Sequence, residues 1–157
     1  MDILPMLLLA PILVAVAYFD LRFMRIPNSL TLISLGILAG VVLLFPPADL
    51  WFRLGIAGLV FALGCVAFAF RLIGGGDVKI LSALMLAVPV NGIAVFANVF
   101  SASMIAGIVV VLTLRRIPQS TNWGWKSFAG SKKFPMGLSI AMAGLAFPLV
   151  ALTLQGT

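Results

Sequence analysis

The chain has 157 residues, of which 63% are hydrophobic and 9% are charged. Soluble domains usually carry about 25% charged and 45–50% apolar residues, so this composition excludes a soluble globular domain and indicates an integral membrane protein. The sequence contains no His, no Glu and a single cysteine, Cys65, which excludes HExxH zinc centres, His-dependent nucleophiles and intrachain disulfides. The net charge is +6, and the charged residues lie between the apolar segments. At those positions we expect the basic residues to contact anionic lipid headgroups and not nucleic acid.

The apolar segments predict an all-α polytopic membrane protein with about six transmembrane helices, in a single membrane-embedded domain over residues 1–157. A spanning helix needs about 20 apolar residues to cross about 30 Å of hydrocarbon. Four spans are delimited by charges, prolines and glycines, and they cover residues 3–19, 30–45, 54–70 and 135–154.

The middle of the chain is harder to divide, because Lys79 and Arg115 bracket 35 uncharged residues. That length is too long for one ordinary span and just enough for two short ones. Residues 89–92, Pro-Val-Asn-Gly, offer a turn between the two, and Asn98 is a later alternative.

The distribution of basic residues decides between one crossing and two, because Lys and Arg concentrate in cytoplasmic loops. One crossing divides them five to five, whereas two leave only Arg53 on the outer side and nine on the other. The distribution therefore favours two crossings in the middle of the chain, which gives six spans with both termini outside. The nine inner residues are Arg22, Arg25, Arg71, Lys79, Arg115, Arg116, Lys126, Lys132 and Lys133.

The same topology sorts the acidic residues. Asp20 closes the first span and Asp77 opens the fourth, so both are predicted at the cytoplasmic end, whereas Asp2 and Asp49 fall on the outer side. From Asp77 to Pro89 is 13 residues, or about 20 Å of helix. If the turn lies there, the fourth helix is too short to cross.

The loop after the first span has a purely structural interpretation. Pro27 favours extended backbone before it and ends the helix that carries Asp20. Asn28 or Ser29 then caps the second helix.

The loop before the fourth span is the run Gly74-Gly75-Gly76, followed by Asp77. Glycines permit positive φ and close backbone approach, and the helix dipole favours a carboxylate near a helix N-terminus. The structural alternative is a flexible hinge in which Asp77 is an N-cap paired with Lys79.

Asp20 and Asp77 together suggest a catalytic pair. Acids inside a membrane cost roughly 2.5–3.5 kcal/mol on insertion scales and usually mark functional sites. Two close carboxylates share a proton and supply a general base and a general acid, with no metal or other cofactor. Two alternatives stay open: a Ser-Lys peptidase using Lys79 and Ser82, and a non-enzymatic transporter or secretion-complex scaffold with the two acids as proton sites.

The basic loop from Arg115 to Phe134 carries Trp123 and Trp125. Tryptophans and lysines at a membrane interface are ordinary anchors, so we expect an anchoring role for this loop.

Three segments resemble motifs of the type IV prepilin peptidases, which are GxGD-type membrane aspartic proteases. In chain order they are Asp20-Leu21-Arg22 with Arg25-Ile26-Pro27-Asn28, Gly74-Gly75-Gly76-Asp77-Val78-Lys79, and Pro135-Met136-Gly137.

The resemblance implies that the protein removes basic leaders from prepilins or pseudopilins at the cytoplasmic face of the inner membrane, alongside the pilus assembly machinery. It carries Asp20 and Asp77 over as the catalytic pair. The chain shows no N-terminal cysteine-bearing domain and so resembles the short form associated with Flp or tight-adherence pili, for which we expect no methyltransferase activity. A GxGD protease that cuts other membrane proteins is the alternative within this resemblance. Substrate-binding or shaping roles carry over to Gly74, Gly75, Gly76, Lys79, Pro27, Asn28 and Pro135.

Overall fold

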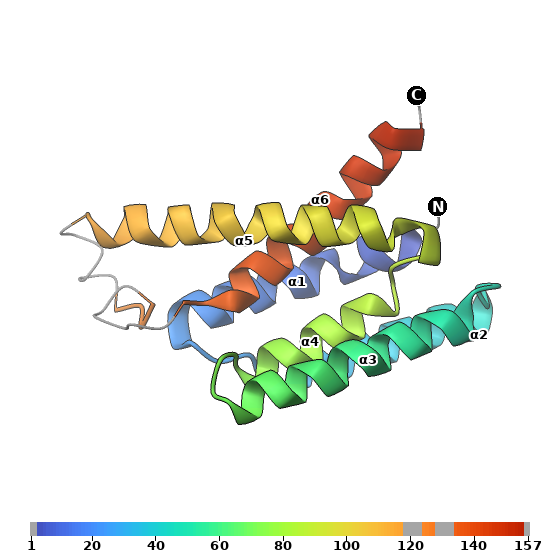
Figure 1. Ribbon diagram of the computed structural model, residues 1–157, viewed down its shortest axis with the longest axis horizontal. Coiled ribbons are helices and arrows are strands. Elements are labelled where there is room, and N and C mark those ends of the chain that lie inside the picture. The colour runs from blue at the N-terminus through green and yellow to red at the C-terminus, as the bar shows by residue number, and fades with distance from the viewer. Residues whose placement is uncertain (1–2, 118–123, 128–133, 156–157) are drawn as a thin grey trace.

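The computed structural model describes residues 3–117, 124–127 and 134–155. Over these ranges the chain forms helices and no strand, which confirms the predicted all-α class (Figure 1). The elements are α1 (Leu4–Phe23), α2 (Asn28–Leu44), α3 (Leu50–Ala69), α4 (Gly75–Met85), the 3-10 helix η1 (Val90–Gly92), α5 (Ile93–Arg115) and α6 (Met136–Gln155).

The described helices differ in whether they can cross a membrane. By length and composition, α1, α3, α5 (with η1) and α6 are long and apolar enough to do so. Helix α2 is apolar but has only 17 residues. Helix α4 has 11 residues, about 16 Å, and therefore falls well short of the hydrocarbon thickness.

The short α4 follows from the turn predicted at residues 89–92. Pro89 precedes η1, which leads directly into α5. The alternative turn at Asn98 is wrong, because Asn98 lies inside α5. The predicted end of the first span at residue 19 was also too early, since α1 continues through Asp20 to Phe23.

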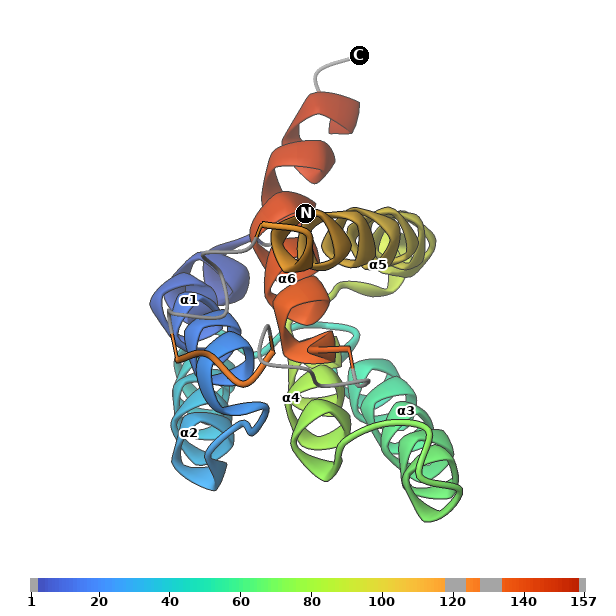
Figure 2. The same cartoon turned by 90° about the vertical axis from the view of Figure 1, so that its left-hand side faces the viewer.

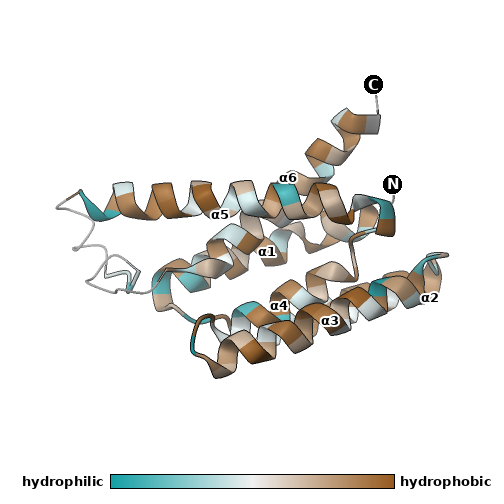
Figure 3. Cartoon of the chain, in the orientation of Figure 1, coloured by the Kyte–Doolittle hydropathy of each residue, from teal (hydrophilic) through white to brown (hydrophobic). Residues whose placement is uncertain are grey.

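Helix α6 is the centre of one half of the bundle, where it packs between α1 and α5 (Figures 1 and 2). In the other half, α4 lies between α2 and α3 and also touches α6 (Figure 2). Buried apolar side chains from α1, α4 and α6 form the core between the two halves, among them Leu13, Val16, Ile80, Leu84, Ile140 and Phe147. In contrast, α3 and α5 consist largely of hydrophobic residues (Figure 3). Little of either helix is buried, as expected of helices that face lipid.

Helices α3 and α4 pack closely because Gly64 has no side chain. A Cβ built on Gly64 would lie 2.6 Å from Cγ1 of Val78, much closer than van der Waals contact allows. Small residues at helix contacts let backbones approach in this way. Val78 follows Asp77 directly, so this contact also fixes the start of α4.

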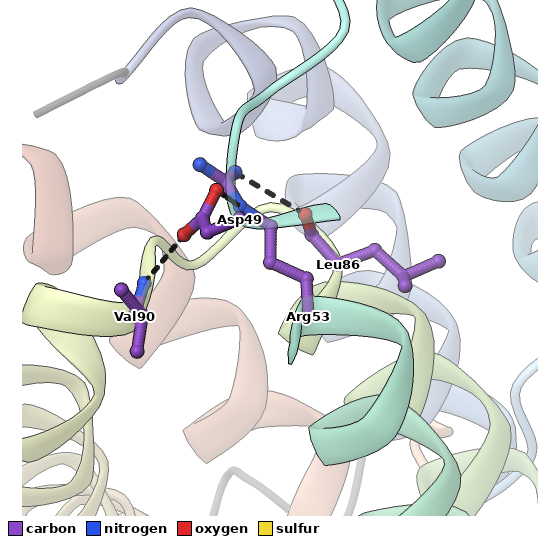
Figure 4. Close-up of polar contacts among 4 residues, drawn as sticks. All are labelled: Asp49, Arg53, Leu86 and Val90. Carbon is purple, nitrogen blue, oxygen red and sulfur yellow. Dashed lines mark hydrogen bonds and ion pairs between the residues drawn. The ribbon is translucent and has the colours of Figure 1, made fainter. Parts of the chain in front are cut away.

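Asp49 and Arg53 fix the other end of α4 (Figure 4). Arg53 is 5% exposed and its Nε lies 2.8 Å from Oδ1 of Asp49. Asp49 Oδ2 accepts a hydrogen bond from the backbone N–H of Val90 at 2.9 Å, and Arg53 Nη1 donates to the carbonyl of Leu86 at 3.5 Å. Backbone polar groups at membrane depth must find partners within the protein. The Asp49–Arg53 pair thus supplies hydrogen-bond partners for backbone groups at the place where α4 ends inside the bundle.

The contacts of Asp49 also set its charge. Burial opposes ionisation, but the hydrogen bonds from Val90 and Arg53 and the charge of Arg53 outweigh it, so the pKa of Asp49 lies below its ordinary 3.8. The single basic residue on the predicted outer side, Arg53, therefore pairs inside the protein.

Candidate active site

Asp20 lies in the last turn of α1 and points into the bundle, where it is only 5% exposed. Its Oδ2 accepts a hydrogen bond from the backbone N–H of Gly137 at 2.6 Å. Gly137 is the second residue of α6, and the first N–H groups of a helix have no partner within it. The N-terminus of α6 thus stabilises a carboxylate supplied by α1.

Gly137 is also the residue whose size permits this contact. A Cβ on Gly137 would lie 2.9 Å from Oδ2 and 3.0 Å from both Cβ and Cγ of Asp20. Any larger residue must push the carboxylate away. The sequence interpretation selected Pro135, which is buried and directly precedes α6, but it missed the role of Gly137.

Asp77 comes from the other half of the bundle, as the third residue of α4. It is 9% exposed, and its Oδ2 accepts a hydrogen bond from the backbone N–H of Gly74 at 3.2 Å. Its other oxygen, Oδ1, is buried and has no hydrogen-bond partner in the described part of the chain. Buried carboxylate oxygens are nearly always paired, so this oxygen needs a partner that the described residues do not supply.

A cavity of about 780 Å³ brings the two acids together. Both Asp20 and Asp77 line it, at the end of the bundle where α1 and α3 end and α4 and α6 begin. A smaller cavity of about 290 Å³ also contains both acids, together with Ile26 and the glycine run. The prediction that these two acids share one end of the bundle is therefore confirmed.

Backbone strain is concentrated at the same cavity. Met24 and Arg71 are the only non-glycine residues with positive φ in the described ranges, at 55° and 60°, and both line the larger cavity. Such conformations cost of order 1–3 kcal/mol each and cluster at functional sites. Met24 ends α1 just after Asp20, and Arg71 lies in the turn that leads from α3 to Gly74.

The glycine run lets α4 begin close to both the acid and the α1–α2 loop. A Cβ on Gly74 would lie 2.6 Å from Oδ2 of Asp77, and a Cβ on Gly76 would lie 2.9 Å from Cβ of Ile26. A Cβ on Gly75 would lie 3.4 Å from the ring of Phe68. The run is thus required by close packing, in addition to any hinge motion.

Lys79 and Asn28 lie together but away from the acids. Lys79 Nζ donates to Oδ1 of Asn28 at 2.9 Å. The structural alternative of an N-cap Asp77 paired with Lys79 is therefore wrong, since Gly74 is the N-cap and Asp77 the third helical residue. The expectation that Asn28 or Ser29 caps α2 is also wrong, because Pro27 holds that position in extended conformation.

The remaining sequence hypotheses concern a Ser-Lys pair and the tryptophans of the basic loop. The Ser82 hydroxyl donates to the carbonyl of Val78 at 2.7 Å, which gives no support to a Ser-Lys pair with Lys79. Trp125 packs edge-to-face on Tyr18 of α1, whereas Trp123 lies outside the described residues. No group of three metal-ligating side chains occurs among residues 3–117, 124–127 and 134–155.

Comparisons with known proteins agree with these motifs. The type IV leader peptidase family matches residues 7–112, which include both acids. A prepilin leader peptidase/N-methyltransferase of Bacillus subtilis (strain 168) is 32% identical over 110 residues, covering 68% of this chain and 43% of the relative. The aligned part thus spans less than half of that relative's length, and no solved structure matches the chain. Because the family match covers more than half of the sequence, the chain belongs to the type IV leader peptidase family.

Proposed function

We propose that the protein is a membrane aspartic endopeptidase that removes the basic leader from type IV prepilins or pseudopilins of the Flp type. The observation that carries this proposal is the pair of buried acids, Asp20 and Asp77, which two different helices supply to one cavity. A buried acid is costly in a membrane protein and is retained where it functions. Membership of a leader peptidase family supports the same reaction.

The proposed mechanism divides the two roles between the acids. Asp20, which accepts the N–H of Gly137, is the ionised base and takes a proton from water as the hydroxide attacks the scissile carbonyl. Asp77 is protonated on the unpartnered Oδ1 and donates that proton to the carbonyl oxygen. The proton on Asp20 then passes to the amide nitrogen, and a hydroxyl of the tetrahedral intermediate returns its proton to Asp77 as the C–N bond breaks. The products are the carboxylic acid and the amine, with Asp20 ionised and Asp77 protonated as at the start.

The same proposal places cleavage at the cytoplasmic face of the inner membrane. The basic loops lie at the end of the bundle that holds the two acids, since Arg22, Arg25 and Arg71 flank them in sequence and Lys79 follows Asp77. Basic loops are retained on the cytoplasmic side. A prepilin whose apolar segment enters the bilayer presents its leader junction at this depth, where the pilus assembly machinery then receives the mature subunit.

Co-expression with a Flp-type prepilin tests the proposal. Leader removal is followed by a gel shift, and wild type is compared with Asp77→Asn at matched expression in the membrane. Cleavage by wild type alone supports both the peptidase and the role of Asp77. Equal cleavage by both proteins contradicts the acid pair. If neither protein cleaves prepilin, proton-coupled transport is measured instead, and its presence in wild type and loss in Asp77→Asn would favour the transporter.

A further inference from the structure

A second concave site lies on the membrane-facing side of the bundle. It is a groove of about 580 Å³ lined by α2, α3 and α4, and it shares no lining residue with the larger cavity that holds the acids. Its walls are mainly apolar, and Leu32 and Phe61 at its edges are 67% and 46% exposed. Side chains of this kind are stable facing hydrocarbon but not water, so the groove opens towards lipid.

One end of the groove is polar and positively charged. Lys79 and Asn28 line it there, near the first turns of α4 and α2, at the end of the bundle that carries Arg22, Arg25 and Arg71. Lys79 is exposed and uses one donor on Asn28, whereas an ammonium carries three. No acid occurs among the described residues that line the groove. The groove therefore offers its positive charge at headgroup level.

Thr31 is the second, independent indication of a ligand. It lines the groove, is 6% exposed, and its Oγ1 has no hydrogen-bond partner among the described residues. A buried hydroxyl without a partner is destabilising, so an acceptor is expected beside it. Thr31 follows Asn28 by one helical turn, about 4.5 Å deeper along α2.

We propose that this groove binds one anionic phospholipid. Its headgroup phosphate contacts Lys79, a glycerol ester oxygen one step below accepts the hydroxyl of Thr31, and an acyl chain lies along the apolar wall. The order of groups along the groove — cation, hydroxyl donor, apolar wall — matches the order phosphate, ester, hydrocarbon in such a lipid. Lys79 in α4 and Leu86, the residue that caps α4, both line the groove. The helix rises about 10 Å between them, enough for the upper part of one chain. Neither Asp20 nor Asp77 lines this site, so its test does not depend on cleavage.

Two matched pairs of variants test the site. Gly58 lines the groove and Gly55 does not, and a Cβ on either glycine meets nothing within 4 Å. Both glycines are exposed, so a leucine side chain can extend from either position, but only that of Gly58→Leu enters the groove. For the headgroup, Lys79→Gln removes the cation of the groove, and Lys126→Gln removes an exposed cation elsewhere.

The measurement is the dissociation constant of the first lipid bound to detergent-purified protein, by native mass spectrometry, for phosphatidylglycerol and phosphatidylcholine with identical acyl chains. We expect wild type to prefer phosphatidylglycerol by about five-fold, the effect of one lysine at a membrane surface. Lys79→Gln should abolish this preference, Gly58→Leu should weaken binding of both lipids, and Gly55→Leu and Lys126→Gln should behave as wild type.

The opposite results would overturn the assignment. Equal affinity of wild type for the two lipids, or equal binding by Gly58→Leu and Gly55→Leu, contradicts a specific lipid in this groove. Competition by inorganic phosphate at concentrations that leave the protein folded would show a free phosphate site in its place. Unfolding temperatures of all variants accompany the titrations, so that loss of binding is separated from loss of structure.

Discussion

At the scale of single residues, the space around Asp20 restricts which residue can stand at position 137. The methyl group of Gly137→Ala would lie 2.9 Å from the Asp20 Oδ2 atom that the backbone N–H of residue 137 now binds. The carboxylate must shift, and a misplacement of about 1 Å can cost about 10²-fold in rate. We expect Gly137→Ala to cleave prepilin about 100-fold more slowly, measured as the initial rate in membranes at matched protein levels.

Gly36→Ala is the control for that substitution, because a Cβ on Gly36 meets nothing within 4 Å. It should cleave at the wild-type rate. A Gly137→Ala protein with nearly wild-type activity would show that Asp20 does not need its present position, and would remove the contact with α6 from the mechanism.

The two acids were predictable from the sequence, but their neighbours were not. Asp20 and Asp77 stand out because acids are rare in this chain and topology places these two at one end. Gly137 contacts Asp20 across 117 residues, and such a contact depends on how α1 and α6 pack. A glycine in the first turn of an apolar helix was the available signal, since small residues mark close helix contacts in membranes.

At the scale of helices, the position of α4 depends on the contact between Gly64 and Val78. Gly64→Ala places a methyl group within 2.6 Å of Cγ1 of Val78, which forces α4 away from α3. Overpacking of this kind typically costs about 1–3 kcal/mol, and it should also lower the cleavage rate because Asp77 is adjacent. Thermal unfolding in detergent and cleavage by the same preparation measure the two effects.

Removing the opposing methyl groups should reverse that change. In Gly64→Ala/Val78→Ala the atoms nearest to the new methyl are absent, so stability and activity should recover in part, as contacting residues do in double-mutant cycles. Additive losses in the double variant would contradict the packing explanation.

The Asp49–Arg53 pair gives α4 a pH-dependent stability. The pKa of Asp49 is below its ordinary 3.8, because hydrogen bonds from Val90 and Arg53 outweigh burial. A lowered folded-state pKa stabilises the protein above the ordinary value, and this contribution disappears as the pH falls through the folded-state value. We expect Asp49→Asn to be about 1–3 kcal/mol less stable than wild type at neutral pH. The gap should close below pH 3.8.

The free energy of unfolding of wild type and of Asp49→Asn is measured across this pH range. The other acids titrate alike in both proteins, so their effect cancels in the difference between the two free energies. If the stability difference between the two proteins stays the same at the lowest pH, the charge of Asp49 does not contribute to stability.

The order and approximate length of the helices were predictable, and their packing was not. Charges, prolines and glycines marked the ends of the apolar segments, and the turn at residues 89–92 correctly implied a short α4. The sequence did not show that Arg53 points inwards, since a lone cation near a span end usually reaches the headgroups. The sequence showed only that Asp49 lies four residues before Arg53, and not that the two side chains pair.

At the scale of the whole molecule, the proposed topology, with the two acids on the cytoplasmic side, rests on the nine-to-one distribution of basic residues. In a Cys65→Ser background, we expect Ala48→Cys to react with a membrane-impermeant maleimide in intact cells. Leu72→Cys should react only after permeabilisation, because the inner loops are basic. Both positions are exposed, so accessibility reports the side of the membrane and not burial. The reverse labelling pattern would place the two acids on the outer face.

The arrangement of the helices around α6 lay beyond the sequence for a physical reason. In water, an apolar stripe shows which face of a helix packs. In a membrane the lipid-facing side is as apolar as the core, and packing relies on small residues and shape. Helix α3 shows the consequence, since it is thoroughly apolar and yet mostly exposed.

The acid pair is tested most directly with purified protein in liposomes and a Flp-type prepilin, by mass spectrometry of the products. Wild type should release one leader peptide and one mature pilin, whereas Asp20→Asn and Asp77→Asn should each release neither while keeping the wild-type unfolding temperature or exceeding it. Cleavage at the same bond by either variant would contradict the account, because a pair that shares one proton between two roles cannot work with one acid.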